Sequence, residues 1–388
     1  MNAARHDGRR LRALGALAGL ALLAGCALWP GHEERAKAAD ATAQAAQEAV
    51  SRPLSVAWVR DVDQRQPMSP PAASRPAVAG DRIVIGGRDG RVHVFDLAGG
   101  ERSRLALDAP CESGALALSP RLVVLTDVEG GLYGVDPAAG VIRWKKTLAS
   151  VVTGHPVAVD GDFLVQTADN HVYRFSPKGE KRWSFSGLAG GFSLQRGASP
   201  LVRDGMVYAV FSNGDVAALH ADSGDLAWRR QLLLLNDAMT LSEMKTPVAD
   251  PVIAGDVLVV SFYQGRLTGL SVADGEVRWQ RSISLKDTPL VDGGRMFAAA
   301  SDGRLLALDA ATGATLWQRK LDDGELVGPA RSGGRLFAAS STGRVYALDR
   351  QGRVLGQASV PGRVDESLTP AAGGVLVRDH LGGLYLIR

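Results

Sequence analysis

The stretch "GRLLALDAATGATLWQRKL" at residues 303–321 decides the fold, because its pattern recurs along the chain. An apolar run leads through a turn containing Asp and Gly to a second short run, which carries Trp317. Apolar and polar residues alternate within each run, which is typical of a half-buried β-strand. The stretch therefore predicts two strands joined by a tight turn.

Eight copies of this phrase occur, spaced 38 to 51 residues apart and beginning at Gly90, Gly130, Asn170, Gly214, Gly265, Gly303, Gly343 and Gly382. Another pair of apolar runs precedes each copy, as in "TPLVDGGRMFAAASDG" at 288–303. Four short strands in a period of about 40 residues are typical of a β-propeller blade. We therefore predict an all-β fold, an eight-bladed β-propeller.

The two ends of the repeat region complement each other. The last copy, "GGLYLIR" at 382–388, supplies a third strand and then the sequence stops. The segment "SVAWVRDV" at 55–62 carries Trp58 and resembles a fourth strand with no three strands before it. Pairing them removes an incomplete sheet edge, so we predict that the N-terminal strand closes the C-terminal blade.

Two residue types recur at fixed places in the phrase. A Trp at one register of the fourth strand predicts packing anchors between blades, at Trp144, Trp183, Trp228, Trp279 and Trp317. An Asp in the preceding turn predicts a cap on backbone N–H groups, at Asp136, Asp222, Asp274 and Asp309. These acidic residues are therefore interpreted as structural.

The N-terminus has the layout of a secretory signal, with a basic stretch and then a short apolar run. Leu23-Ala24-Gly25-Cys26 matches a lipobox, which predicts a lipoprotein signal peptide at 1–25 and lipidation of Cys26; an ordinary signal with an accidental Cys is the alternative. Ala27 favours the outer membrane, with the protein lipid-anchored on its periplasmic face. We expect a flexible tether at 26–53 and the propeller at 54–388.

Charge and motif content narrow the function. The formal charge of +3 arises within residues 1–25, since the remaining chain has 40 basic and 40 acidic side chains, which argues against a nucleic-acid partner. Beyond Cys26 only Cys111 remains, so no intrachain disulfide forms and a buried thiol is expected. The familiar zinc, haem, acyl-transfer and nucleotide motifs are absent, and the histidines lack ligand spacing. We predict no catalytic residue, no metal site and no cofactor.

Two connections are longer than the repeat requires, at 184–200 and 229–251. Both follow a Trp strand, so an up-and-down blade order places them side by side on one face of the ring. Their apolar residues, including Phe192 and the run from Leu232 to Leu235, predict an interaction surface. Alternatively, Leu232 and Leu234 continue the Trp228 strand.

The phrase "ALDAATGATLWQRKL" resembles the pyrroloquinoline quinone (PQQ) type of propeller repeat. The resemblance implies a propeller, and it raises the alternative of a quinoprotein or another periplasmic propeller that binds a small ligand. Quinoprotein dehydrogenases of that family carry an adjacent Cys pair over the cofactor. Cys111 alone cannot supply that pair.

The lipobox, the tether, eight PQQ-like blades closed by an N-terminal strand, and an L-x-R-G-like string together resemble the BamB family of outer-membrane lipoproteins. The resemblance implies a non-catalytic scaffold of the β-barrel assembly (BAM) complex that docks on BamA POTRA domains. Leu194 and Arg196 match the family's docking residues, with Phe192 as an apolar neighbour. Glu243 and Asp250 stand near the family's acidic pair without aligning cleanly.

Two further partner hypotheses remain open. Strand addition at an exposed blade edge would hold a POTRA edge or an unfolded outer-membrane protein. A propeller lipoprotein could also serve a different envelope complex.

Overall fold

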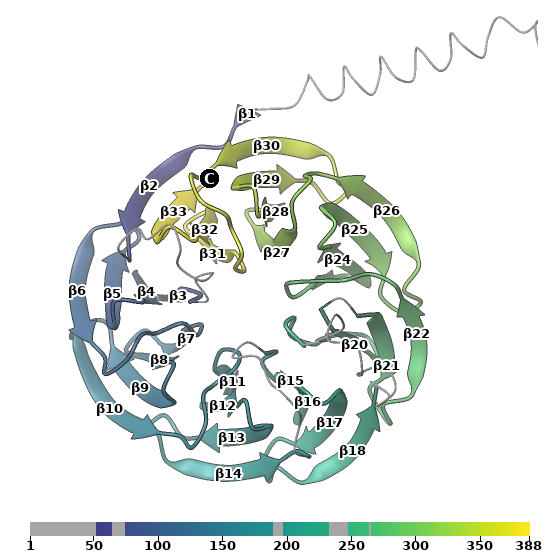
Figure 1. Cartoon of the computed structure of the whole chain (residues 1–388), viewed down its shortest axis with the longest axis horizontal. Helices are drawn as coiled ribbons and strands as arrows, with labels where there is room; N and C mark the ends of the chain where they lie inside the picture. Colours follow the sequence, from purple (N-terminus) through teal and green to yellow (C-terminus); the bar gives the residue numbers. More distant parts are fainter. Residues whose placement is uncertain (1–51, 64–73, 189–196, 233–246, 264) are drawn as a thin grey trace, which may run out of the picture. The chain divides into compact units, whose positions relative to one another are not determined.

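A computed structural model describes residues 52–63, 74–188, 197–232, 247–263 and 265–388. The chain divides into two units, Met1–Ser51 and Arg52–Arg388, and only the second contains described residues. Its strands form eight sheets, seven with four strands and one with five, arranged as the blades of a ring (Figure 1). The predicted eight-bladed all-β propeller is therefore confirmed. No helix in the described ranges is long and apolar enough to cross a membrane.

Each blade is an antiparallel meander that runs from the ring axis outward. The innermost strands are β3 (Ala77–Ala79), β7 (Leu116–Ser119), β11 (Val157–Val159), β15 (Leu201–Arg203), β19 (Val252–Ala254), β23 (Leu290–Asp292), β27 (Leu326–Ser332) and β31 (Thr369–Ala371). The second strands are β4 (Arg82–Gly86), β8 (Leu122–Thr126), β12 (Asp162–Gln166), β16 (Met206–Val210), β20 (Val257–Ser261), β24 (Arg295–Ala299), β28 (Arg335–Ser340) and β32 (Gly374–Arg378). We number the blades one to eight in this order.

The outer half of each blade is the repeated phrase itself. The third strands are β5 (Arg91–Asp96), β9 (Gly131–Asp136), β13 (His171–Phe175), β17 (Asp215–His220), β21 (Leu267–Ser271), β25 (Arg304–Asp309), β29 (Arg344–Leu348) and β33 (Gly383–Ile387). The outermost strands are β6 (Glu101–Ala106), β10 (Val141–Thr147), β14 (Lys181–Ser186), β18 (Leu226–Gln231), β22 (Val277–Arg281), β26 (Thr315–Lys320), β30 (Val354–Ser359) and β2 (Val56–Asp61).

The hydrophobic core lies between neighbouring blades. The second and third strands are buried on both faces, as in β8 and β20, where every residue is buried. The outermost strands alternate between exposed and half-buried residues, as in β18. One cluster joins Tyr208 of blade four to Leu258 of blade five, and similar clusters follow around the ring. Burial of this apolar surface between sheets is the main driving force for assembling the ring.

In six blades a recurring Trp connects the blade to the next one, as the sequence predicted. The indole N–H donates to a carbonyl in the β-turn of the following blade: Trp58 to Leu97 (3.1 Å), Trp144 to Pro177 (2.8 Å), Trp183 to Ala221 (2.9 Å), Trp228 to Val272 (3.0 Å) and Trp317 to Arg350 (3.2 Å). Trp279 packs on Gly313 in the same way, although its indole N–H has no partner. In three blades an Arg two residues later donates to that turn as well: Arg60 to Gly99, Arg230 to Gly275 and Arg281 to Gly313.

Capping by the turn aspartates is confirmed at three of the four predicted positions. Asp136 accepts the N–H groups of Ala138 and Ala139, and Asp274 and Asp309 accept equivalent bonds in their own turns. Among described residues, Asp222 forms no such bond. In that turn Ser223 donates to Asp225 and accepts its N–H instead.

The N-terminal strand closes the ring, as predicted. Strand β2 pairs antiparallel with β33, and Ser55 and Arg388 exchange backbone hydrogen bonds at 3.0 and 2.9 Å. Just before it, β1 (Arg52–Pro53) pairs in parallel with β30 of blade seven (Figure 1). The first strand pair therefore starts two residues ahead of the expected propeller boundary. Here Gly356, which pairs with Arg52 of β1, occupies the position that holds Trp in six other blades.

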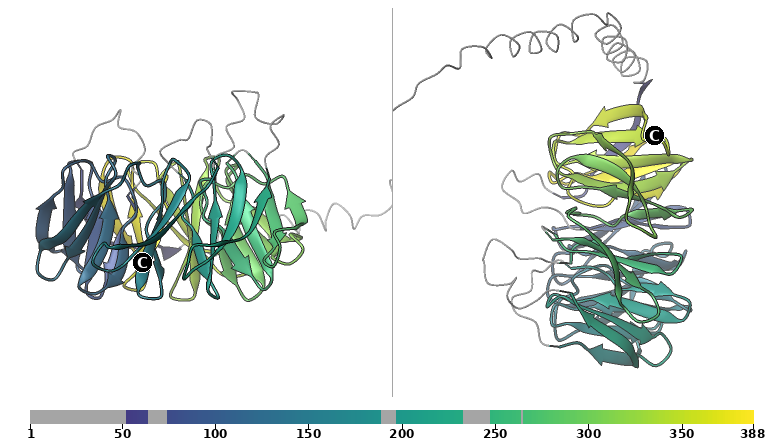
Figure 2. Two further views of the ribbon diagram at one scale, coloured as in Figure 1. Left: turned by 90° about the horizontal axis from the view of Figure 1, so that it is seen from below. Right: turned by 90° about the vertical axis from the view of Figure 1, so that its right-hand side faces the viewer.

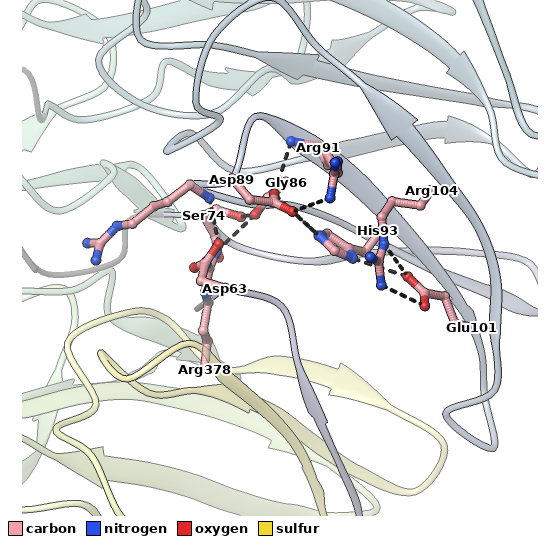
Figure 3. A network of polar contacts seen from close by, with 10 residues as sticks. Asp63, Ser74, Gly86, Asp89, Arg91, His93, Glu101, Arg104 and Arg378 are labelled. Carbon is pink, nitrogen blue, oxygen red and sulfur yellow. Dashed lines mark hydrogen bonds and ion pairs between the residues drawn. The ribbon is translucent and has the colours of Figure 1, made fainter. Parts of the chain in front are cut away.

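A buried polar network lies beside this closure (Figure 3). Arg378 of β32 forms an ion pair with Asp63, which follows β2, and donates to the carbonyl groups of Gly86 at 3.1 Å and Ser74 at 3.4 Å. Asp63 also accepts the N–H of Arg88 at 2.6 Å. One guanidinium therefore joins the N-terminal strand, the C-terminal blade and blade one.

Candidate functional site

A cavity of about 520 Å³ lies on the ring axis, since all eight blades contribute residues to its wall. Its lining comes from the connections between outermost and innermost strands and from two turns between second and third strands. These parts of an up-and-down blade lie on one face of a propeller. The described residues at the ends of the two long connections lie on this face of the ring. Figure 2 shows the ring in side view.

Five blades share one position in the cavity wall, the residue before a proline. A proline comes directly before the innermost strand in five blades, at Pro76, Pro156, Pro200, Pro251 and Pro289, and lies within that strand in two more, at Pro329 and Pro370. Proline restricts the preceding residue to an extended conformation, which fixes the direction of its side chain. Five of these preceding residues line the cavity: Arg75, His155, Ser199, Asp250 and Thr288.

Four of these residues form a hydrogen-bonded series across blades three to six. The N–H of Ser199 donates to Asp250 Oδ1 at 2.6 Å, and the N–H of Asp250 donates to Thr288 Oγ1 at 3.0 Å. Ser199 Oγ accepts the N–H of His155 at 2.8 Å and lies 2.8 Å from its Nδ1. The series fixes the starts of four consecutive blades relative to one another.

The combination of Ser, His and Asp differs in geometry from a nucleophile relay. Both Ser199 Oγ and Asp250 Oδ2 face the same imidazole nitrogen, Nδ1, at 2.8 and 3.8 Å. A relay needs the hydroxyl and the carboxylate on opposite nitrogens. Burial lowers the pKa of His155, although Asp250 opposes the shift. The Ser199 hydroxyl and Nδ1 of the neutral imidazole share one hydrogen bond, whose direction follows from the tautomer, and this arrangement indicates a structural role.

Asp287 connects blades six, seven and eight at the cavity wall. Its carboxylate accepts the N–H of Thr288 at 2.7 Å, the N–H of Gly328 at 2.5 Å and the hydroxyl of Ser367. Burial raises the pKa of Asp287, against the opposing effects of Ser367, Arg75 and the two N–H groups. Asp287 is only 6% exposed, so ionisation of its carboxylate depends on these hydrogen-bond donors.

Lys286 adds a second link across the same blades. Its Nζ donates to Glu325 at 3.0 Å and to Asp365 at 2.8 Å, and the Tyr263 hydroxyl donates to Glu325 at 2.9 Å. Seven carboxylates line the cavity, at Glu112, Asp127, Asp250, Asp287, Glu325, Asp365 and Glu366, against the cations Arg75 and Lys286. The axial wall is therefore polar and rich in carboxylates.

Most predicted site residues fall outside the described ranges. These are Cys26, Phe192, Leu194, Arg196 and Glu243. Asp250 is described and lies in the cavity wall rather than on an open rim, with 22% of its side chain exposed. Leu232 lies one residue beyond the end of β18 and packs against the core cluster of blades four and five, so it belongs to the core and not to an exposed surface. Leu234 lies outside the described ranges.

Reactive groups are sparse in the described part of the chain. No three His, Cys, Asp or Glu residues there are grouped to hold a metal ion. Cys111 is fully buried, and burial raises the pKa of its thiol to about 12. Sequence reasoning missed the axial wall, although the repeated X-Pro pairs before the innermost strands could have indicated it.

Solved structures with a similar fold include propellers of different functions. The crystal structure of BamB from Moraxella catarrhalis superposes with a TM-score of 0.73 at 19% identity, covering 86% of this chain and 99% of that chain. Quinohemoprotein alcohol dehydrogenase from Comamonas testosteroni gives 0.67 at 13% identity, covering 87% and 76%. At such identities the likeness concerns the fold alone, and it agrees with the eight-bladed propeller that the strands of this chain form.

Sequence comparison then narrows the class to one family. The family model for outer membrane protein assembly factor BamB matches residues 88–319 and 301–387. The chain is 27% identical over 290 residues to BamB of Bordetella pertussis, covering 74% of this chain and 72% of the relative. It is 24% identical over 186 residues to BamB of Yersinia pestis, about half of each protein (48% and 47%). The chain belongs to the BamB family.

Proposed function

We propose that this chain is a non-catalytic, lipid-anchored subunit of the BAM complex that assists the assembly and insertion of β-barrel proteins into the outer membrane. The family match, which runs from residue 88 to residue 387, carries this proposal. The anchor is Cys26, and the propeller works on the periplasmic face of the membrane. A rigid ring that presents connections from several blades on one face suits a scaffold, because binding residues are commonly held on loops above a fixed framework.

The partner surface consists of the two long connections, and the partner is BamA through its POTRA domains. Phe192 and Leu194 supply apolar contact, Arg196 supplies forked hydrogen bonds at its edge, and Glu243 adds charge. Other BAM subunits share the complex, and unfolded outer-membrane proteins are a further class of ligand. The fixed starts of blades four and five support this surface, because they hold the ends of both connections on the cavity face.

Substitution of Arg196 tests the docking surface. Arg196→Glu should weaken binding of the purified BamA periplasmic region at least about tenfold, because an interface Arg often contributes 2 kcal/mol or more. Arg203→Glu is the matched control, since Arg203 is 55% exposed at the opposite end of β15. Equal affinities for wild type and the Arg196→Glu variant, measured by calorimetry, would exclude this surface.

The lipid anchor has its own test. Cys26→Ala should abolish incorporation of labelled palmitate and release the protein from the membrane fraction, because the acyl chains supply the membrane affinity. Retention of label by the variant would show that Cys26 is not the acceptor.

A further inference from the structure

The ends of the two long connections meet in the cavity wall. The connection between β14 and β15 ends at Ser199, and the connection between β18 and β19 ends at Asp250. The 2.6 Å hydrogen bond from the Ser199 N–H to Asp250 Oδ1 joins these two ends directly. They are 51 residues apart in the sequence and belong to different blades.

We propose that Asp250 is a positioning residue that holds the two docking connections in a fixed relation, and that it does not contact the partner itself. This inference rests on the proposed function, because it assigns Asp250 a part in the same docking surface. It differs from the expectation that the family resemblance raised, in which Asp250 supplies charge to the interface.

The contacts of Asp250 support a role inside the wall. Oδ1 is committed to the N–H of Ser199, Oδ2 faces His155 at 3.8 Å, and the backbone N–H is bound to Thr288. A hydrogen bond between an N–H and a carboxylate is stronger than one between neutral groups. With 22% of its side chain exposed, the carboxylate has little surface left for a partner.

The end of the first connection is held from its other side by blade three. The N–H of Gly197 donates to Thr153 O at 2.9 Å, and a Cβ on Gly197 would lie 2.8 Å from Thr153 Oγ1. His155 of the same blade binds the Ser199 hydroxyl. Asp250 is the hydrogen-bond acceptor from blade five, beside Ala198, which is buried in the core cluster of blades four and five. Its loss would remove the polar contact with blade five and leave the apolar one.

The test compares three substitutions in the full mature protein. Asp250→Ala should weaken binding of the BamA periplasmic region about tenfold. This is the expected effect of losing one charge-assisted hydrogen bond that orders the docking surface before the partner binds. Asp250→Asn should stay within about threefold of wild type, since its amide oxygen still accepts the Ser199 N–H. If Asp250 instead pairs with a cation on BamA, the Asn variant would bind as weakly as the Ala variant and the loss would diminish in high salt.

Asp322→Ala is the control for a general loss of stability. Asp322 is 5% exposed and accepts hydrogen bonds from Ser340, Thr342 and Tyr346, but it lies on the connection between β26 and β27. The Asp322→Ala substitution should leave the affinity for BamA unchanged while lowering the melting temperature of the protein. If Asp250→Ala does not fold, Asp250→Thr replaces it, because threonine occupies the same pre-proline position in blade six at Thr288.

Amide hydrogen exchange provides a readout without the partner. Peptides that contain the described ends of the connections, 197–200 and 247–250, should exchange faster in Asp250→Ala than in wild type, and should be unchanged in Asp322→Ala. If Arg196→Glu weakens binding but Asp250→Ala changes neither binding nor exchange, this inference is wrong and the docking surface stands. If Arg196→Glu has no effect on binding, the docking surface itself is wrong, while the exchange result still decides the role of Asp250.

Discussion

Ring closure depends on the buried ion pair between Arg378 and Asp63, and Arg378→Met tests how much. Arg378 is 4% exposed and Asp63 is 9% exposed. Removing the guanidinium leaves a buried carboxylate without its counter-ion and leaves the carbonyl groups of Ser74 and Gly86 without one donor. Breaking one side of a buried pair costs about 3–5 kcal/mol, so we expect a loss of that size in the free energy of unfolding.

Urea unfolding followed by tryptophan fluorescence measures this loss, because Trp58 lies in the closing strand. The double variant Asp63→Asn, Arg378→Met should recover at least about half of it, since no uncompensated charge remains. Arg353→Met is the exposed control: Arg353 is 74% exposed and 2.6 Å from Asp349, so its loss should cost under about 1 kcal/mol. Equal losses for Arg378→Met and Arg353→Met would refute the reasoning.

Three other predictions concern the ring. Gly275→Ala should lower the unfolding free energy by about 2–4 kcal/mol, because φ is +72° there and a Cβ would lie 2.6 Å from Trp228. The control Gly205→Ala should cost only about 1 kcal/mol, because φ is +73° there but the space around it is open. Equal costs for the two variants would contradict the packing of Trp228 on Gly275. The raised pKa of Asp287 favours its protonated form in the folded state, so the stability that the protonated group contributes is present below the ordinary Asp pKa and is lost as pH rises through the folded pKa. The stability of Asp287→Asn relative to wild type should therefore improve as pH rises above about 4, and a flat difference would argue against the shift. Deleting Gly382–Arg388 should remove β33 and prevent ring closure, which would appear as a loss of protease resistance across the ring. A protease-resistant deletion variant would show that the pairing of β2 with β33 is not needed to close the ring.

The repeat made the architecture predictable. The same strand–turn–strand phrase recurs every 38 to 51 residues, so a single copy indicated the strands and the blade, and its Trp, where present, indicated the contact to the next blade. The same reasoning placed Trp58 opposite "GGLYLIR", because an incomplete blade at each end has one way to be completed. It did not anticipate β1, since Arg52–Pro53 pairs in parallel outside the repeat.

The axial wall could not be predicted in the same way. Its side chains differ in every blade, from the cation of Arg75 to the carboxylate of Asp250 and the hydroxyl of Thr288. They meet only because the ring places positions about 40 residues apart around one axis, so no local motif announces them. The prolines that follow them do recur, but a proline reports backbone direction and says nothing about the chemistry of its neighbour.

The pairing of β1 with β30 has a mechanical meaning. The polypeptide that precedes Arg52 joins the ring through the same strand segment that closes it. A force on that polypeptide therefore acts first on the pairing of β1 with Gly356 and Gln357 of β30, and then on the longer pairing of β2 with β33. Tension from a membrane anchor would be borne in series by these two joints, so the load that the anchor can carry without opening the ring is set by them.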